Sequence, residues 1–204
     1  LPTGTGYASK YLCSQSFIAG RDMNAVFEED VKPIHPLFLV VSNTKDDAAG
    51  TVTSAAFGFW SPITAVYREG FGCSLMIDST RSELLAQVAD IPPRQAPLMD
   101  VPWPQGESVQ LGPAHEGVDL PALKAVIADA FEEPSATSHR NTHAIVVVPK
   151  GELIAEAYNP EFTPQTPILG WSMTKTITAA LMGIMNGEGE VDVTGPAPIP
   201  EWQG

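Results

Sequence analysis

Segment 170–175, Gly-Trp-Ser-Met-Thr-Lys, combines a hydroxyl and an amine at a spacing that could support nucleophilic catalysis. On a helix, Ser172 and Lys175 would share one face because they are three residues apart. A serine at a helix start lies beside unpaired backbone N–H groups and the positive end of the helix dipole, which favour an oxyanion. A partly desolvated lysine has a lowered pKa and could accept the hydroxyl proton. The pattern predicts either a nucleophile with its general base, or a capping serine beside a solvated lysine.

The residues after Lys175 predict the helix that would position this pair. Large apolar side chains recur there with helical periodicity and form one stripe, at Met173, Ile177, Leu181, Ile184 and Met185. Gly187 and Gly189 indicate where the helix ends. We expect the stripe to face a core, and most of it to lie away from the serine and the lysine.

The same four-residue pattern occurs a second time, at residues 42–45 (Ser-Asn-Thr-Lys). A polar, turn-like cluster follows at residues 46–50, so no apolar helix supports this copy. We therefore predict that residues 42–45 form a loop without a catalytic role.

The composition is that of a globular protein, with 44% hydrophobic and 17% charged residues. The net charge of −13 disfavours nucleic acid or an anionic membrane as a partner. No apolar segment approaches the roughly 18 residues that a membrane-spanning helix needs. Because the histidines are scattered and the cysteines lack metal-ligand spacing, we predict no metal and no cofactor. The chain opens at Leu1 without a methionine, so we expect that preceding sequence has been removed.

The two cysteines, Cys13 and Cys73, are either buried free thiols or one disulfide. A bridge would close a loop of about 60 residues and stabilise the fold by about 4 kcal/mol in the chain-entropy model. Each cysteine lies in a segment that resembles a strand, so we expect the two to be close together in one small sheet.

Residues 1–90 predict a β-rich N-terminal layer. We expect extended segments at 7–16, 17–19, 36–42, 51–59, 63–68 and 73–77, and short helices at 23–31 and 82–89. Residues 91–114 contain too many prolines for regular structure and predict an extended linker.

Residues 115–204 predict a helix, an antiparallel hairpin, a loop and the helix of Ser172, which is an α+β order. Asp119 should cap the first helix, whose acidic residues Asp129, Glu132 and Glu133 we interpret as a solvated face. Residues 143–148 predict a buried strand that is apolar on both faces, and residues 153–158 its hairpin partner.

This order resembles the serine β-lactamase and penicillin-binding-protein superfamily, within it most of all the class-C-β-lactamase-related hydrolases and esterases, including the aminohexanoate-oligomer type. The resemblance rests on residues 140–147 (Arg-Asn-Thr-His-Ala-Ile-Val-Val), 151–156 (Gly-Glu-Leu-Ile-Ala-Glu) and 170–175, and continues at 187–193, 196–198 and 201–202. Residues 8–14 and 70–75 resemble the N-terminal extension of longer members. The family resemblance implies an α+β fold: a β-rich N-terminal layer plus the N-terminal part of a β-lactamase-like antiparallel sheet with flanking helices.

The resemblance implies that Ser172 attacks a small-molecule amide or ester, including a β-lactam, and forms an acyl-enzyme. Lys175 would act as general base, and the backbone N–H of Ser172 as one oxyanion donor. The family's tyrosine loop and Lys/His-x-Gly strand would lie beyond residue 204, so we expect a further C-terminal part or a partner chain, in an oligomer or complex. Export to the periplasm or cell envelope is expected, with the cytoplasm as the alternative.

Two other interpretations remain open from the sequence. The chain could be a non-catalytic binding or regulatory protein on the same scaffold, or residues 1–114 could be a β-rich interaction module that the rest supports. In the hydrolase interpretation, the 204-residue chain alone should neither turn over substrate nor fold as a stable monomer, because the edge of the hairpin and the apolar stripe would be exposed.

Overall fold

A computed structural model of the chain describes residues 2–87, 96, 98–109, 117–197, 199 and 201. The chain divides into two compact units, residues 1–166 and 167–204. The predicted domain boundaries at residues 90 and 115 stay a prediction, because residues 88–95, 97 and 110–116 lie outside the described residues.

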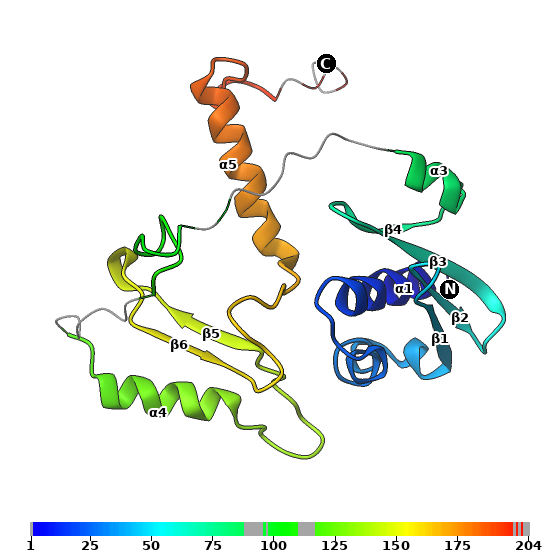
Figure 1. Cartoon of the computed structure of the whole chain (residues 1–204), viewed down its shortest axis with the longest axis horizontal. Helices are drawn as coiled ribbons and strands as arrows, with labels where there is room; N and C mark the ends of the chain where they lie inside the picture. Colours follow the sequence, from blue (N-terminus) through cyan, green and yellow to red (C-terminus); the bar gives the residue numbers. More distant parts are fainter. Residues whose placement is uncertain are drawn as a thin grey trace. The chain divides into compact units, whose positions relative to one another are not determined.

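The first unit contains a four-stranded antiparallel sheet with consecutive neighbours, covered on one face by a helix (Figure 1). The strands are β1 (Val41–Asp46), β2 (Thr51–Ala56), β3 (Trp60–Arg68) and β4 (Gly72–Leu75). The helix is α1 (Pro2–Phe17), which packs against the strands. The strands predicted at 51–59, 63–68 and 73–77 are confirmed with boundaries shifted by a few residues.

The prediction of extended segments at 7–16 and 17–19 is wrong, because residues 2–17 form α1. Its buried face includes Thr5, Ala8, Ser9, Leu12, Cys13 and Ser16, which recur at helical spacing. Most of these residues are small or polar, so the helix has little amphipathic signal for a pattern search to detect.

Cys13 of α1 and Cys73 of β4 form a disulfide with a Cα–Cα distance of 6.1 Å. Their predicted proximity is confirmed, although Cys13 lies in a helix and not in a strand. Around the bridge the core contains fully buried Leu12, Val52 and Ala65. The disulfide therefore fixes the helix to the sheet at the centre of the first unit.

Helical turns connect α1 to the sheet. They are α2 (Met23–Val26), a π-helical turn (Phe27–Val31), and two 3₁₀ turns (Lys32–Ile34 and Pro36–Val40). The predicted helix at 23–31 is confirmed, whereas the strand predicted at 36–42 begins only at Val41. His35 caps the last turn, since its Nδ1 accepts a hydrogen bond from the Leu37 N–H at 3.0 Å.

The second Ser-x-x-Lys copy lies in β1, so its prediction as a loop is wrong. Ser42 pairs with Ala55 and Lys45 pairs with Val52 of β2. In a strand, residues three apart point to opposite faces of the sheet, so this serine and lysine cannot form a catalytic pair.

Two further elements precede and follow the Pro-rich region. The short helix predicted at 82–89 is confirmed as α3 (Arg81–Ala86), which begins with a capping box between Thr80 and Glu83. Residues 98–109 form turns without a helix or a strand. The remaining residues of the expected linker are not described.

The second half of the first unit contains α4 (Leu120–Phe131) and the hairpin β5 (Ala144–Val147) and β6 (Ala155–Tyr158), joined by a 3₁₀ turn at Pro149–Gly151. The Asp119 cap is confirmed, since its carboxylate accepts the Ala122 N–H at 3.0 Å. The burial predicted for 143–148 is wrong. No residue of β5 is buried: three of its four residues are half-buried and Val146 is 51% exposed in a two-stranded sheet.

The second unit consists mainly of a 3₁₀ turn (Trp171–Met173) and α5 (Thr174–Gly187). The predicted helix and its end are confirmed, and Gly189 has φ +78°. The whole is mixed α and β with an antiparallel sheet, which is compatible with an α+β class. Among the described residues, no helix has the length and apolar character needed to cross a bilayer.

Candidate functional site

Ser172 and Lys175 lie within hydrogen-bond distance of each other. The Lys175 Nζ donates to the Ser172 Oγ at 2.8 Å, and both side chains are exposed. The distance allows direct proton transfer from the hydroxyl to a neutral amine, as a nucleophile and its base require.

The backbone before α5 places Ser172 in a 3₁₀ turn at the helix entry. The Met173 N–H donates to the Gly170 carbonyl at 2.8 Å, and Met173 is the N-cap of α5. No side-chain hydrogen bond caps either the 3₁₀ turn or α5, so the alternative of a capping serine is wrong. Its hydroxyl is instead in contact with the lysine.

Trp171 has φ +42°, which is the left-handed region and unusual for a bulky residue. Strained residues of this kind are frequent beside functional side chains, where the surrounding structure holds them. The conformation of Trp171 turns the backbone immediately before Ser172, so Ser172 lies at the entry of α5. There the first-turn N–H groups and the helix dipole favour negative charge.

The apolar stripe of α5 is exposed. Its five members, Met173, Ile177, Leu181, Ile184 and Met185, are between 41% and 68% exposed. Large exposed apolar surfaces commonly mark interaction sites. The described residues of the second unit supply no buried core for this helix.

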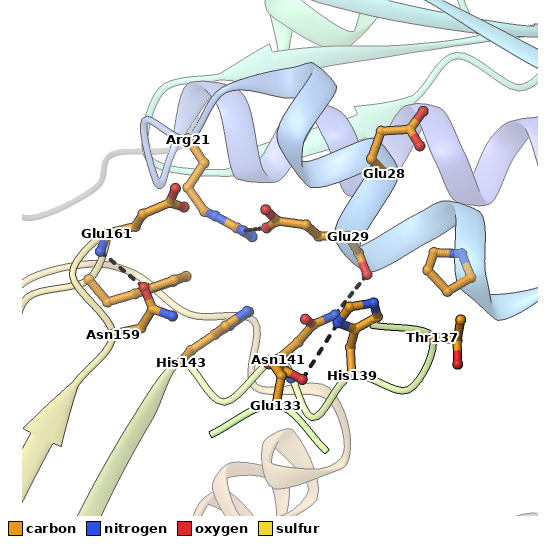
Figure 2. Close-up of a pocket in the computed structure, with 12 residues that line it drawn as sticks. Arg21, Glu28, Glu29, Glu133, Thr137, His139, Asn141, His143, Asn159 and Glu161 are labelled. Atoms are coloured by element: carbon orange, nitrogen blue, oxygen red, sulfur yellow. Dashed lines mark hydrogen bonds and ion pairs between the residues drawn. The ribbon is translucent and has the colours of Figure 1, made fainter. Parts of the chain in front are cut away.

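The first unit contains a separate cavity of about 490 Å³ (Figure 2). Its lining is mainly charged or polar and consists of Arg21, Glu28, Glu29, Pro33, Glu133, Thr137, His139, Asn141, His143, Asn159, Glu161 and Phe162. Its charged side chains are four carboxylates and one guanidinium, and one of the carboxylates, Glu28, is paired with Lys32 at 2.6 Å.

A buried ion-pair network forms one wall of this cavity. Arg21 Nη1 contacts the Asp30 Oδ2 at 2.5 Å, and both side chains are about 95% buried. Arg21 Nη2 contacts Glu29 at 3.0 Å, and the Tyr11 hydroxyl donates to Asp30 at 3.2 Å. Burial and the adjacent Asp30 carboxylate raise the pKa of Tyr11, so it stays a hydrogen-bond donor.

His143 connects the network to the hairpin. Its ring stacks on Phe162 with centroids 4.3 Å apart, and its Nε2 lies 3.8 Å from Asp30. Burial lowers the pKa of His143, which outweighs the opposing effect of Asp30. Figure 2 shows Arg21 extending from the N-terminal segment toward His143 and Asn159.

Sequence reasoning missed this cavity. The solvated face predicted at Asp129, Glu132 and Glu133 is confirmed, since all three residues are exposed. The Glu133 carboxylate also accepts the Arg140 N–H at 2.6 Å and lies 3.6 Å from His139. Asp129 similarly contacts the Arg140 guanidinium at 3.3 Å. The four-residue spacing of His139 and His143 was the sequence signal available for this cavity. It could not reveal the opposite wall, which residues 21–33 form. In the part of the chain that the structure describes, no cluster of three or more His, Cys, Asp or Glu residues could hold a metal ion.

Tyr158 and Asn159 end the hairpin strand and make local contacts. The Tyr158 hydroxyl donates to Glu156 at 3.0 Å, and the Asn159 Oδ1 accepts the Glu161 N–H at 3.2 Å. Burial is the largest cause of a raised pKa of Tyr158. These contacts give Tyr158 and Asn159 a structural role at the end of β6.

Comparison with protein-family models, with curated proteins and with solved structures gave no match. The functional argument therefore depends on the chemistry of the chain itself. Its two candidate sites are the Ser172–Lys175 pair in the second unit and the acidic cavity in the first.

Proposed function

We propose that the chain belongs to a serine hydrolase that cleaves an amide or ester, including a β-lactam, through an acyl-enzyme on Ser172. The observation that carries the proposal is the 2.8 Å contact between the Lys175 amine and the Ser172 hydroxyl. The proposal is further supported by the location of Ser172 at the entry of α5, where no side-chain hydrogen bond caps the 3₁₀ turn or the helix.

In the proposed reaction, neutral Lys175 accepts the Ser172 proton while the Oγ forms a bond to the substrate carbonyl carbon. The tetrahedral oxyanion lies against the Ser172 N–H at the positive end of the helix dipole. The C–N or C–O bond then breaks, and the Lys175 ammonium returns its proton to the leaving group. Water attacks the acyl-enzyme, gives a proton to Lys175, and releases the acid, with the lysine proton returning to Ser172.

The resemblance to the β-lactamase superfamily is part of the same proposal. We infer that further polypeptide covers the exposed stripe of α5 and supplies the second oxyanion donor, either as a partner chain or as additional sequence. Removal of water by this cover would favour the neutral form of a lysine. The Cys13–Cys73 disulfide supports export to an oxidising compartment.

A fluorophosphonate or β-lactam probe tests the nucleophile. In the complete protein or complex, the label should map to Ser172 by peptide mass spectrometry, and Ser172→Ala should abolish it. Lys175→Ala should slow labelling by at least about a hundredfold, the range of general-base catalysis. Ser42→Ala in β1 is the matched control and should label at the normal rate. A label that survives Ser172→Ala, or that maps to Ser42, overturns the proposal.

The acidic cavity favours a second candidate function, the binding of a small cationic molecule without catalysis. Its lining has four carboxylates and one guanidinium; Arg21 is already paired with Glu29 and Asp30, and Glu28 is paired with Lys32 at 2.6 Å. Glu133 and Glu161 are therefore the carboxylates that would bind the cation. Isothermal titration with putrescine tests this function. Glu161→Gln should weaken binding, whereas Glu69→Gln, on the exposed β3–β4 turn, should not. Absence of heat from the wild-type chain, or equal affinity of both variants, rejects it.

A further inference from the structure

The charged side chains of the four-stranded sheet all lie at one of its two ends. The formal charges of residues 41–75 are all at the β1–β2 and β3–β4 turns, at Lys45, Asp46, Asp47, Arg68 and Glu69. Both turns lie at the same end because the strands are antiparallel neighbours. The opposite end contains the β2–β3 turn, and residues 33–44 and 48–67 contain no Asp, Glu, Lys or Arg. In a chain of net charge −13, this end is an uncharged surface.

Large apolar side chains are exposed at that uncharged end. We define the aromatic tip as Leu39, Phe57, Phe59 and Trp60, which are 55–78% exposed. The Phe57 N–H donates to the Val40 carbonyl at 2.7 Å, which holds the turn beside Leu39. Isolated exposed apolar residues are normal, but four neighbours of this size indicate an interaction surface.

The entry of α1 extends the uncharged surface. The Thr5 hydroxyl donates to the Ser61 carbonyl at 2.8 Å, so the start of the helix lies at the same end of the sheet. A mostly apolar pocket of about 330 Å³ lies there, lined by residues that include Tyr7, Leu37 and Phe38. No Asp, Glu, Lys or Arg lines it.

The backbone of the tip is better suited to other residues than to phenylalanine. Phe57 has φ +53° and Gly58 has φ +79°, and the Phe59 N–H donates to the Ala56 carbonyl at 3.2 Å. Tight turns with two positive φ values favour Asn-Gly or Asp-Gly. A phenylalanine in this conformation costs stability, and the Phe57 side chain is 58% exposed, so core packing does not account for its presence in the turn.

We propose that the aromatic tip docks into the interface of a zwitterionic phospholipid surface. Trp and Phe partition favourably into the headgroup region of a bilayer. The N–H groups of Phe57 and Phe59 are already hydrogen-bonded to the Val40 and Ala56 carbonyls, so insertion leaves neither without a partner. The absence of Lys and Arg from the tip, with the net negative charge of the chain, excludes attraction to anionic lipid as the driving force. A turn at the end of a sheet can enter a soft interface without a matching groove.

Vesicle flotation with phosphatidylcholine tests the docking. The wild-type chain should float with these vesicles equally in low and high salt, because apolar insertion is not screened. Brominated phosphatidylcholine should quench part of the tryptophan fluorescence. Trp60→Phe should remove that quenching, although three other tryptophans remain.

Phe57→Asn is the decisive variant because it separates binding from folding. It should raise the melting temperature or leave it unchanged while weakening vesicle binding about tenfold. Phe59→Ser should weaken binding to a similar extent. The matched control is Phe71→Ser. Phe71 is exposed at the charged end of the sheet, and the Arg68 Cζ lies 4.5 Å from its ring centroid. This variant should bind like the wild type.

Four results would overturn the inference. They are no flotation of the wild-type chain, flotation that requires anionic lipid, unchanged binding by Phe57→Asn, or equal loss of binding by Phe71→Ser. Self-association that Phe59→Ser abolishes in the absence of lipid would assign the tip to a second copy of the chain and would also reject lipid docking. Because none of these measurements involves Ser172, they stand apart from the test of the hydrolase.

Discussion

Substitution of Asp30 by Asn should destabilise the first unit strongly. Asp30 and Arg21 are about 95% buried with 2.5 Å between Oδ2 and Nη1, so the change leaves a buried guanidinium with one fewer counter-charge. Removing one partner of a buried ion pair typically costs 3–5 kcal/mol. Glu29 still contacts Arg21 at 3.0 Å, so we expect the lower end of that range, about 3 kcal/mol.

Equilibrium unfolding in urea measures this effect as a shift of midpoint at constant m-value. The matched control is Glu29→Gln, whose carboxylate bonds the same guanidinium but is 45% exposed. Exposed pairs contribute about 1 kcal/mol or less, so this control should shift the midpoint little. If both variants lose the same free energy, burial does not determine the strength of this network. The reasoning would then be wrong.

Three further predictions concern the bridge, His143 and α5. Replacing Cys13 and Cys73 together by Ala should cost about 4 kcal/mol of unfolding free energy in urea, and a loss below about 1 kcal/mol would contradict the entropic argument. Because the folded state lowers the pKa of His143, it binds fewer protons than the unfolded state, so stability should fall as pH decreases below about 6.5. His143→Gln should flatten that slope in pH-dependent melts, and an unchanged slope would show that His143 does not cause it. Leu181→Lys on the exposed stripe should reduce self-association in sedimentation without lowering the melting temperature. If the wild-type chain instead sediments as a compact monomer of 21.7 kDa, the stripe needs no partner.

Local patterns in the sequence were sufficient for elements whose signals lie within a few residues. The α5 helix, the Asp119 cap and the β5–β6 hairpin could be predicted because apolar periodicity, caps and turn residues act over short distances. The juxtaposition of Ser172 and Lys175 follows in the same way from a spacing of three on a helical turn.

The α1 helix shows where local pattern fails. Apart from Leu12, the buried residues named on its face are Thr, Ala, Ser and Cys, which become core residues only because the sheet covers them and Cys13 bonds to Cys73. Residues 42–45 form a strand for a similar reason, since their backbone groups pair with β2. Tertiary contacts therefore override weak local preference at both places.

The acidic cavity was decided by tertiary structure alone. Its walls come from residues 21–33 and 133–162, which are at least 100 residues apart in the chain. No local pattern relates Arg21 to His143 or Asn141 to the Glu29 carbonyl, although Asn141 donates to that carbonyl at 3.0 Å. Spacing of three residues on one helix fixes a distance by backbone geometry, whereas contacts across the chain depend on how all the intervening elements pack.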